Sequence, residues 1–449
     1  MKNTARLNGV SFSRREVLKI GMLGAAGMTF SGGLVSDAWG GGVPVKAKAK
    51  SIIQIWLWGG PSHLDTFDPK PEAGADYCGK YTTPIKTNVD GIRICQALPM
   101  LAKMADKYSL LRGMTHGNNG HETASYMVMS GNRPADGIVN PSMGAVVALK
   151  KGYDAGYKGL IPPYVTLTSP QGRFSEAGFL GSRYKPFSTG GDPRRTPFAV
   201  EGIVAKGISE KRQRSRRRLL GELDTFGRRM SGNPLTERMD RNREEAYSLI
   251  LGEARKTFDL STESNKLRES YGKNSLLGQS CLQARKLVEA GVPFITINSK
   301  KWDTHKKHFE SMQTMLPDLD RAISTLLTDL DQRGLLESTI VWVGGEFGRG
   351  PKIQQDAPWN GGRSHHGKAF SHLVAGGGFR GGHVVGTTDN RGIEVIDRKI
   401  YPWDLHASMY KLMGINYKDT LPHPAGRLAY ISPLAAGNIE TGGVLSEII

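Results

Sequence analysis

The sequence has few cysteines, no long apolar run, and fewer acidic than basic residues. Its three cysteines, Cys78, Cys95 and Cys281, allow at most one disulfide, which excludes a scaffold built from disulfides. No stretch has the ~20 strongly apolar residues of a membrane span, so we expect no stable membrane span in the mature form. Hydrophobic residues still make up 38% of the chain, which excludes wholesale disorder.

Acidic residues number 42 against 60 lysines and arginines, which gives a formal net charge of +18. The basic run 211–218 lies within a charged, helical and strand-poor segment at about 205–260, which we interpret as a helical insertion. Aromatic residues are nearly absent there, so a solvated helix face is favoured over a nucleic-acid site. We expect no nucleic-acid partner. The basic surface instead suits an anionic small molecule or polysaccharide.

The amino-terminal residues have the pattern of a secretory signal. Arg14 and Arg15 precede a soft apolar run at 20–35 and small residues at 38–40. This order is typical of twin-arginine (Tat) export, with the Tat translocase as partner and a periplasmic or secreted location. Residues 1–45 are therefore expected to be signal peptide and linker. The alternative is an uncleaved amphipathic anchor.

Residues 46–449 alternate between apolar β-rich runs and amphipathic helical patterns. This alternation predicts an α/β domain with a largely parallel central sheet flanked by helices. The expected strands are 51–58, 163–168, 293–298, 338–344 and 371–375, and the expected helices are 276–290, 309–333 and 404–413.

Histidines and carboxylates gather beside the expected strands. Ligands bind beyond the carboxyl ends of strands in open α/β sheets, so these loops define one candidate site. Seven of the eleven histidines lie in them. Imidazole together with carboxylate suits Zn, Mn or Fe. The loop residues are His63, Asp65 and Asp68; His116 and His121; Asp303, His305 and His308; Glu346 and Arg349; and Arg363, His365, His366 and Lys368.

The nucleophile is less clear from the residues. Thr123 and Ser125 lie at the start of an expected helix, where backbone N–H groups favour anions. Thr123 is our candidate, and the alternative is an ordinary residue of a first helical turn. Residues 281–285 read Cys-Leu-Gln-Ala-Arg, which fails the Cys-x-Pro/Ala-x-Arg pattern at its third position. A formylglycine sulfatase is therefore not expected.

Several motifs together resemble one known family. They are Gly-Gly-Pro-Ser-His-Leu-Asp-Thr-Phe-Asp-Pro-Lys (59–70), Met-Thr-His-Gly-Asn-Asn-Gly-His-Glu-Thr (114–123), Trp-Asp-Thr-His (302–305), Gly-Glu-Phe-Gly-Arg (345–349) and Gly-Arg-Ser-His-His (362–366). The chain is similar, from about residue 50 to its end, to the exported bacterial family called domain of unknown function 1501. That family is placed in the alkaline phosphatase and sulfatase superfamily, so the resemblance implies that fold.

The resemblance also implies a set of metal ligands. Matched motif by motif, the set is Asp65, Asp303, His305 or its substitute His308, Glu346 and His365, with Thr123 near the position of the nucleophile. Two positions depart from the superfamily pattern. Glu346 is followed by phenylalanine where the superfamily often has Asp-His, and serine precedes His365 where relatives have aspartate. The expected cofactor is a divalent metal (Zn, Mn or Ca), as one or two ions.

Two functions follow as hypotheses. The first is an exported metal-dependent hydrolase of phosphate or sulfate esters, possibly acting on sulfated polysaccharide. In it, Arg349, Arg363 or Lys368 binds the non-bridging oxygens of the ester. The second is a non-catalytic exported protein of the same fold that binds polyanionic glycan or a surface partner.

Overall fold

The computed structural model describes most of the chain, in two compact units, Met1–Pro44 and Val45–Ile449. In the first unit, β1 (Ala5–Leu7) pairs with β2 (Val10–Phe12) in antiparallel fashion. The residues 13–45 of the expected signal segment, and most of the expected insertion at 205–260, lie outside the described residues. The described residues are 5–7, 10–12 and 46–449, without 136, 138, 170, 171, 173–175, 196–211, 213, 214, 216, 217 and 220–252.

The second unit is built on an eight-stranded sheet with the strand order β14-β6-β13-β10-β3-β9-β7-β8. All of its strands run in one direction except β13, which is antiparallel to both of its neighbours. The expectation of an α/β fold with a largely parallel sheet is confirmed. The strands are β3 (Ser51–Leu57), β6 (Tyr108–Met114), β7 (Tyr164–Leu167), β8 (Phe187–Ser188), β9 (Phe294–Ser299), β10 (Thr339–Gly344), β13 (Phe370–Ala375) and β14 (His383–Val385).

The reversed direction of β13 decides where the preceding loop lies. The carboxyl ends of parallel strands meet at one edge of a sheet. Because β13 runs the other way, its beginning lies at that same edge, beside the ends of β10 and β6. Residues 363–368, which precede β13, therefore reach the loops that follow β3, β6, β9 and β10.

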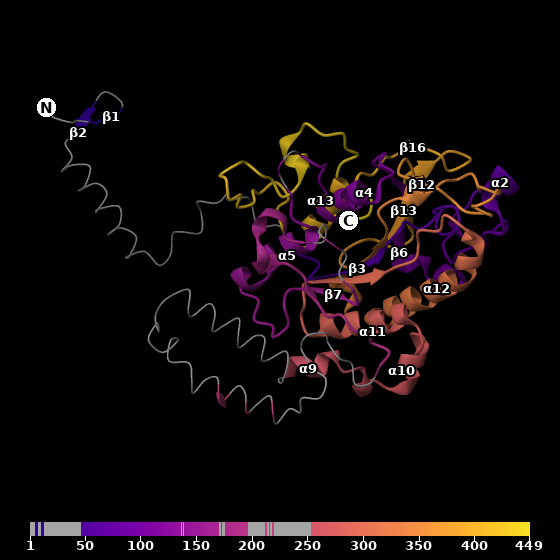
Figure 1. The fold of residues 1–449 in the computed structure, drawn as a ribbon, viewed down its shortest axis with the longest axis horizontal. Coiled ribbons are helices and arrows are strands. Elements are labelled where there is room, and N and C mark those ends of the chain that lie inside the picture. The colour runs from indigo at the N-terminus through magenta and orange to yellow at the C-terminus, as the bar shows by residue number, and fades with distance from the viewer. Residues whose placement is uncertain are drawn as a thin grey trace. The chain divides into compact units, whose positions relative to one another are not determined.

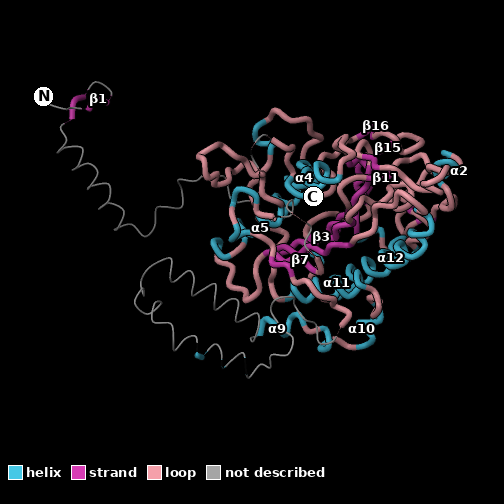
Figure 2. Tube along the Cα trace, viewed as in Figure 1, coloured by secondary structure: helices cyan, strands magenta, loops and turns pink. Residues whose placement is uncertain are grey.

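Helices cover both faces of the sheet (Figures 1 and 2). Alternate residues of β3 point to opposite faces, as strand geometry requires. Ile53 and Ile55 pack in one buried core with residues of α11 and α12, whereas Ile52 and Trp56 pack in a second core with residues of α5 and α13. The helices are α2 (Ala75–Cys78), α3 (Pro99–Ala102), α4 (His121–Ser130), α5 (Met143–Lys151), α9 (Glu253–Phe258), α10 (Asn265–Ser270), α11 (Leu276–Glu289), α12 (His308–Gln332) and α13 (Pro402–Leu412).

Short elements complete the domain. The small antiparallel ribbons are β4 (Ile85–Lys86) with β5 (Arg93–Ile94), β11 (Gly348–Arg349) with β12 (His365–His366), and β15 (Thr387–Thr388) with β16 (Val395–Asp397). All three cysteines are buried and unpaired, so Cys78 and Cys95 do not form the single disulfide that the sequence allowed.

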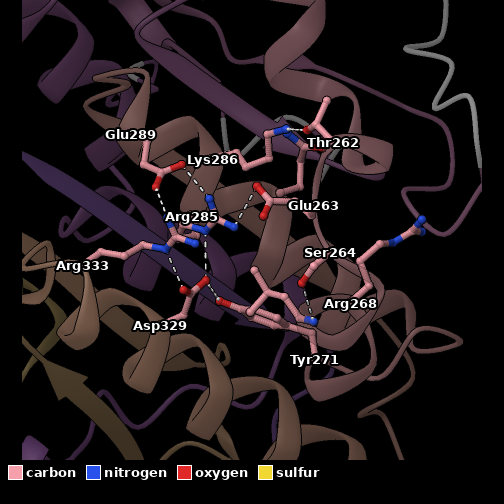
Figure 3. A network of polar contacts seen from close by, with 12 residues as sticks. Thr262, Glu263, Ser264, Arg268, Tyr271, Arg285, Lys286, Glu289, Asp329 and Arg333 are labelled. Atoms are coloured by element: carbon pink, nitrogen blue, oxygen red, sulfur yellow. Dashed lines mark hydrogen bonds and ion pairs between the residues drawn. The ribbon is translucent and has the colours of Figure 1, made fainter.

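A buried arginine joins the two helices on one face of the sheet (Figure 3). The Arg285 guanidinium on α11, only 1% exposed, lies 2.9 Å from Asp329 on α12, 3.0 Å from Glu263 and 2.6 Å from Glu289. The next residue, Lys286, donates a 2.7 Å hydrogen bond to the carbonyl of Asp259. Together these contacts fasten the segment that follows residue 252 to the body of the domain.

We expect Arg285→Met to lower the free energy of unfolding by about 3 kcal/mol, because it leaves buried carboxylates without their cation. The matched variant Arg333→Met removes a guanidinium that is 37% exposed from the same network and should cost no more than about 1 kcal/mol. Urea titration of both variants measures the difference. Equal losses would contradict the assignment of Arg285 as the centre of the network.

Candidate metal centre

Glycine lets the loop after β3 approach the loop after β9. Gly59 has a φ of +110°, and a Cβ atom there would lie 2.2 Å from the backbone nitrogen of Asp303. Its own N–H donates a 2.9 Å hydrogen bond to Oε1 of Glu346, which follows β10. No side chain fits at this position, so the glycine brings Asp303 and Glu346 to the same edge of the sheet.

His121 is the first residue of α4, in the segment that follows β6. Its Nδ1 lies 2.7 Å from Oε1 of Glu346, and its Nε2 lies 3.3 Å from Oδ2 of Asp303. The Trp58 ring stacks on the imidazole with a centroid separation of 5.1 Å. The imidazole is therefore fixed between two carboxylates.

His365 comes from the short ribbon of β11 and β12, where it pairs with Arg349. Its Nδ1 lies 2.8 Å from the carbonyl oxygen of Asn119. Its Nε2 lies 3.1 Å from Oδ1 of Asp303 and 2.8 Å from Nε2 of His305. The Phe347 ring, 4.5 Å away between centroids, stacks against it.

Asp303 is the carboxylate on which these groups converge. Nε2 of His305 lies 3.1 Å from its Oδ1, and the buried Arg349 donates to the same oxygen at 2.5 Å. Burial alone would raise the pKa of Asp303, but hydrogen bonds from His121, His365 and Arg349 hold it well below its ordinary value. Asp303 is therefore ionised at neutral pH.

The protonation of His121 follows from its two carboxylate neighbours. Burial lowers its pKa, but Asp303 and Glu346 outweigh burial and raise it to about 9. In the absence of another cation, His121 therefore carries a proton at neutral pH. The two carboxylates thus stabilise a positive charge at His121, either as that proton or as a metal ion.

The hydrogen-bond partners of Nδ1 in His121 and His365 show that Nε2 is the ring nitrogen left to bind a cation beside Asp303. A carbonyl oxygen can only accept, so Nδ1–H of His365 donates to Asn119. Nδ1–H of His121 donates in the same way to the Glu346 carboxylate. With a metal ion in place of the Nε2 protons, both imidazoles would direct their Nε2 lone pairs at that ion, beside the Asp303 carboxylate. Metal-binding histidines usually have this arrangement, with the outer N–H held by a carbonyl or a carboxylate.

This donor set fits a divalent metal. One ligand atom each from His121, Asp303 and His365 lie within 4.8 Å of one another. Ligands at about 2.0–2.2 Å from one ion lie at most about 4.4 Å apart. Nε2 of His121 and Nε2 of His365 lie 3.3 and 3.1 Å from the oxygens of Asp303, within that limit. Within the described part of the chain, Oε2 of Glu346 is a buried oxygen without a hydrogen-bond partner, and Nε2 of His121 has only its 3.3 Å approach to Asp303. A cation at this place would satisfy both kinds of atom.

Asp65 and His308, both expected as metal ligands, lie in a separate buried cluster. Nε and Nη2 of Arg363 contact the two oxygens of Asp65 at 2.7 and 3.1 Å, and Nε2 of His308 lies 2.8 Å from Oδ2. Burial would raise the pKa of Asp65, but Arg363 and His308 bring it well below its ordinary value. Arg349 links the clusters by donating to the backbone carbonyl of Arg363 at 3.3 Å.

The other expected residues are spread around the centre. Arg349 is wholly buried and donates to Gly60 O and Asp303, which makes it a support for the cluster. Lys368 is exposed and forms a 2.7 Å ion pair with Glu394. Thr123 lies half-buried in the first turn of α4, two residues after His121.

Sequence reasoning placed His121 in a candidate loop but did not include it among the metal ligands. Its position could have indicated a ligand, since it opens the helix that follows a strand end. At that position the sequence was interpreted in terms of a hydroxyl nucleophile instead. Asn119 acts through its backbone carbonyl, which no side-chain pattern reveals.

A family model described as "Protein of unknown function (DUF1501)" matches residues 49–441. No curated protein matches the chain significantly. Among the described residues, no helix has the length and apolarity to cross a membrane.

Several solved structures share features of the fold at low identity. They include the lipoteichoic acid synthase LtaP from Listeria monocytogenes (9% identity, TM-score 0.38, covering 87% of this chain and 76% of that chain), the PsFucS1 sulfatase from Pseudoalteromonas sp. (13%, 0.37, 88% and 72%), and alkaline phosphatase from the Antarctic bacterium TAB5 (12%, 0.32, 78% and 96%).

Proposed function

The chain belongs to the DUF1501 family of proteins of unknown function, and on that premise we propose that it is an exported, metal-dependent hydrolase of phosphate or sulfate esters. One observation carries the proposal. The Nε2 atoms of His121 and His365 converge on Asp303, while their Nδ1 atoms are held by Glu346 and by the Asn119 carbonyl. Imidazoles held in this way from outside, together with a carboxylate, suit Zn or Mn.

We propose a single ion, held by His121, Asp303 and His365, with Glu346 beside it. Asp65 and His308 do not fit a second ion, because Arg363 already neutralises the Asp65 carboxylate within a buried cluster. When bound, the ion supplies Lewis-acid polarisation of an ester oxygen. The Arg363 guanidinium, with its fixed positive charge, compensates the Asp65 carboxylate in place of a second metal ion.

His305 is suited to move a proton in this reaction. Burial lowers its pKa, and the nearby Arg349 and His365 lower it further, which outweighs the opposite effect of Asp303. His305 is therefore neutral at pH 7, and its side chain is 33% exposed, within reach of solvent. In our proposal its Nδ1, the ring nitrogen that does not face His365 and Asp303, accepts a proton from an attacking water or from the Thr123 hydroxyl.

Metal analysis tests this function most directly. Protein purified from its native export route should contain about one Zn or Mn ion per chain, and it should hydrolyse at least one class among aryl phosphates, phosphodiesters and aryl sulfates. Dialysis against a chelator should remove both the metal and the activity, and the metal should restore activity. A protein that holds no metal after Zn or Mn is supplied would exclude the hydrolase.

The alternative function is a non-catalytic exported protein that binds polyanionic glycan. The Arg363–Asp65 ion pair favours it, because this contact removes one carboxylate from the expected metal set. In that case glycan binding would persist without any metal.

Export is also part of the proposal. Replacing both Arg14 and Arg15 by lysine should block export and leave precursor protein in the cytoplasm, because the Tat route reads the arginine pair. Immunoblotting of the periplasmic fraction measures the effect, and replacing Lys46 and Lys48 by arginine is the matched control. Normal export of the Arg14→Lys/Arg15→Lys variant would contradict the assignment.

A further inference from the structure

A cavity of about 910 Å³ opens at the ends of β7, β8 and β9, beside the first turn of α11. Its volume is near the upper end of the roughly 300–1,000 Å³ found for small-molecule sites. One phosphate or sulfate group would fill only a small part of it. The cavity therefore has room for a portion of the substrate beyond the group that reacts.

The cavity adjoins the metal centre through one continuous loop. Ser299, Lys300, Lys301 and Trp302 line it, and the next residue in the chain is Asp303. Trp302 also donates a 3.1 Å backbone hydrogen bond to the carbonyl of Trp58, whose ring stacks on His121. The wall of the cavity thus ends at the residue that precedes Asp303 in the chain.

Two lysines at the rim have no acidic partner among the described residues. Lys300 and Lys301 are exposed and form no ion pair there, although both lie in the wall of the cavity. Lys301 has a φ of +83°, a backbone conformation that costs about 1 kcal/mol or more for a residue with a Cβ atom. The loop retains this strain while both of these lysines line the cavity.

The interior of the cavity has an apolar side and a hydroxyl side. Leu276, Ile297 and Met315 supply the apolar surface, whereas Ser188 and Ser280 supply hydroxyl groups. The Ser188 hydroxyl is buried and has no hydrogen-bond partner within the described residues. A sugar ring matches this mixture, because it offers hydroxyls at its rim and C–H groups on its faces. An acyl chain would leave the hydroxyl side without partners.

We propose that this cavity is a carbohydrate subsite in which Lys300 and Lys301 bind a second anionic group, so that the substrate is an oligosaccharide bearing at least two sulfate or phosphate groups. The inference rests on the proposed ester-hydrolase function for the identity of the reacting group. Asp318, the single carboxylate among the described lining residues, accepts hydrogen bonds from sugar hydroxyls.

Binding to the full mature chain carrying Asp303→Asn tests the inference without turnover. The probes are a disulfated disaccharide, a diphosphorylated disaccharide, the uncharged disaccharide and an aryl monosulfate, each titrated by calorimetry at fixed salt. We expect a dianionic disaccharide to bind at least about tenfold more tightly than the uncharged disaccharide or the aryl monosulfate. Comparing the first two probes shows whether sulfate or phosphate is preferred.

Paired variants locate the site. Lys300→Gln/Lys301→Gln should weaken binding of the dianionic disaccharide by roughly tenfold or more, since two charge-assisted contacts are lost. Lys306→Gln/Lys307→Gln removes the same charge from the same loop, also with one residue at positive φ, but outside the cavity lining, and should change affinity by less than about twofold. Leu276→Trp, at the exposed start of α11, should also block binding by filling the mouth of the cavity.

The outcomes separate this inference from the proposed function. Equal losses in both lysine pairs, tight binding of the aryl monosulfate alone, or no binding of any dianionic disaccharide would overturn the subsite. If wild-type protein nevertheless holds metal and hydrolyses simple esters, only the subsite fails. If the lysine pair and Leu276→Trp act as expected but the wild type holds no metal, the subsite is upheld and the hydrolase fails.

Discussion

Asp303→Asn should release the divalent metal and reduce ester hydrolysis by about 10³-fold, the largest effect that we expect from one substitution. Among the residues that the structure describes, Asp303 is the only carboxylate that both His121 and His365 approach with Nε2, at 3.3 and 3.1 Å. An amide at this position keeps the shape but loses the negative charge that the cation requires. Metal content by mass spectrometry and initial rates with the best substrate measure the two losses.

The matched control for this variant is Asp154→Asn. Asp154 is an exposed carboxylate that accepts hydrogen bonds from Arg183 and Tyr184, far along the chain from the cluster. Metal content and rate should remain at the wild-type level there. Retention of one bound ion in Asp303→Asn, with circular dichroism unchanged, would show that the ion is held elsewhere and would remove the basis of the proposed function.

Acid should unfold the protein between about pH 6 and pH 4, because four histidines are buried in the neutral form. Burial lowers the pKa of His63, His116, His372 and His406 to about 4, against an ordinary value of 6.5. Since each folded pKa is depressed, the unfolded chain binds protons first as the pH falls. The stability contributed by these residues is complete above pH 6.5 and is lost progressively down to pH 4.

The expected size of this loss is large. Each histidine costs about 0.7 kcal/mol per pH unit at pH 6.5, where the unfolded imidazole is half protonated, and about 1.4 below that, so the four together remove roughly 6 kcal/mol between pH 6.5 and pH 5. A typical domain has only about 5–15 kcal/mol in total. Chemical denaturation at a series of pH values measures the slope of stability against pH.

His406→Gln is the variant that checks the cause of acid unfolding. Nε2–H of His406 donates a 2.8 Å hydrogen bond to the carbonyl of Val128, and glutamine keeps a donor for that bond. The variant should lose about a quarter of the slope below pH 6.5, whatever its stability at pH 7. An unchanged slope would mean that groups other than the buried histidines take up the protons.

The main strands and helices could be predicted from sequence because their signals are local. The run of apolar β-formers at 51–58 became β3 within one residue, and the spacing of leucines at 309–333 matched α12 within one residue at each end. The ribbon of β11 with β12 could not be predicted in this way. Each of its strands has two residues, and only the pairing of Arg349 with His365 across the fold defines them.

The candidate site was predictable as a neighbourhood but not as a set of contacts. The residue types at strand ends predicted that one edge of the sheet would hold Asp303, His305, Glu346 and His365. The partner of Asp65 could not be read from the chain, since Arg363 lies almost 300 positions away and its long side chain can reach several places. Tertiary packing decides that Asp65 contacts an arginine while Asp303 contacts two imidazoles. Such packing produces no periodic pattern in the sequence.

The pairing of β3 at the centre of the sheet also bears on when the protein can fold. Ser51 pairs with Thr339 on one side, and Ile52 pairs with Phe294 on the other. The first strand of this sheet to be synthesised, β3, can therefore pair only after partners more than 200 residues later have been made. Contacts so distant in sequence make folding slow and leave apolar strands exposed meanwhile. A chain of this topology benefits from completing its fold, protected from aggregation, in the compartment where it is synthesised. An export route that accepts folded cargo would allow this.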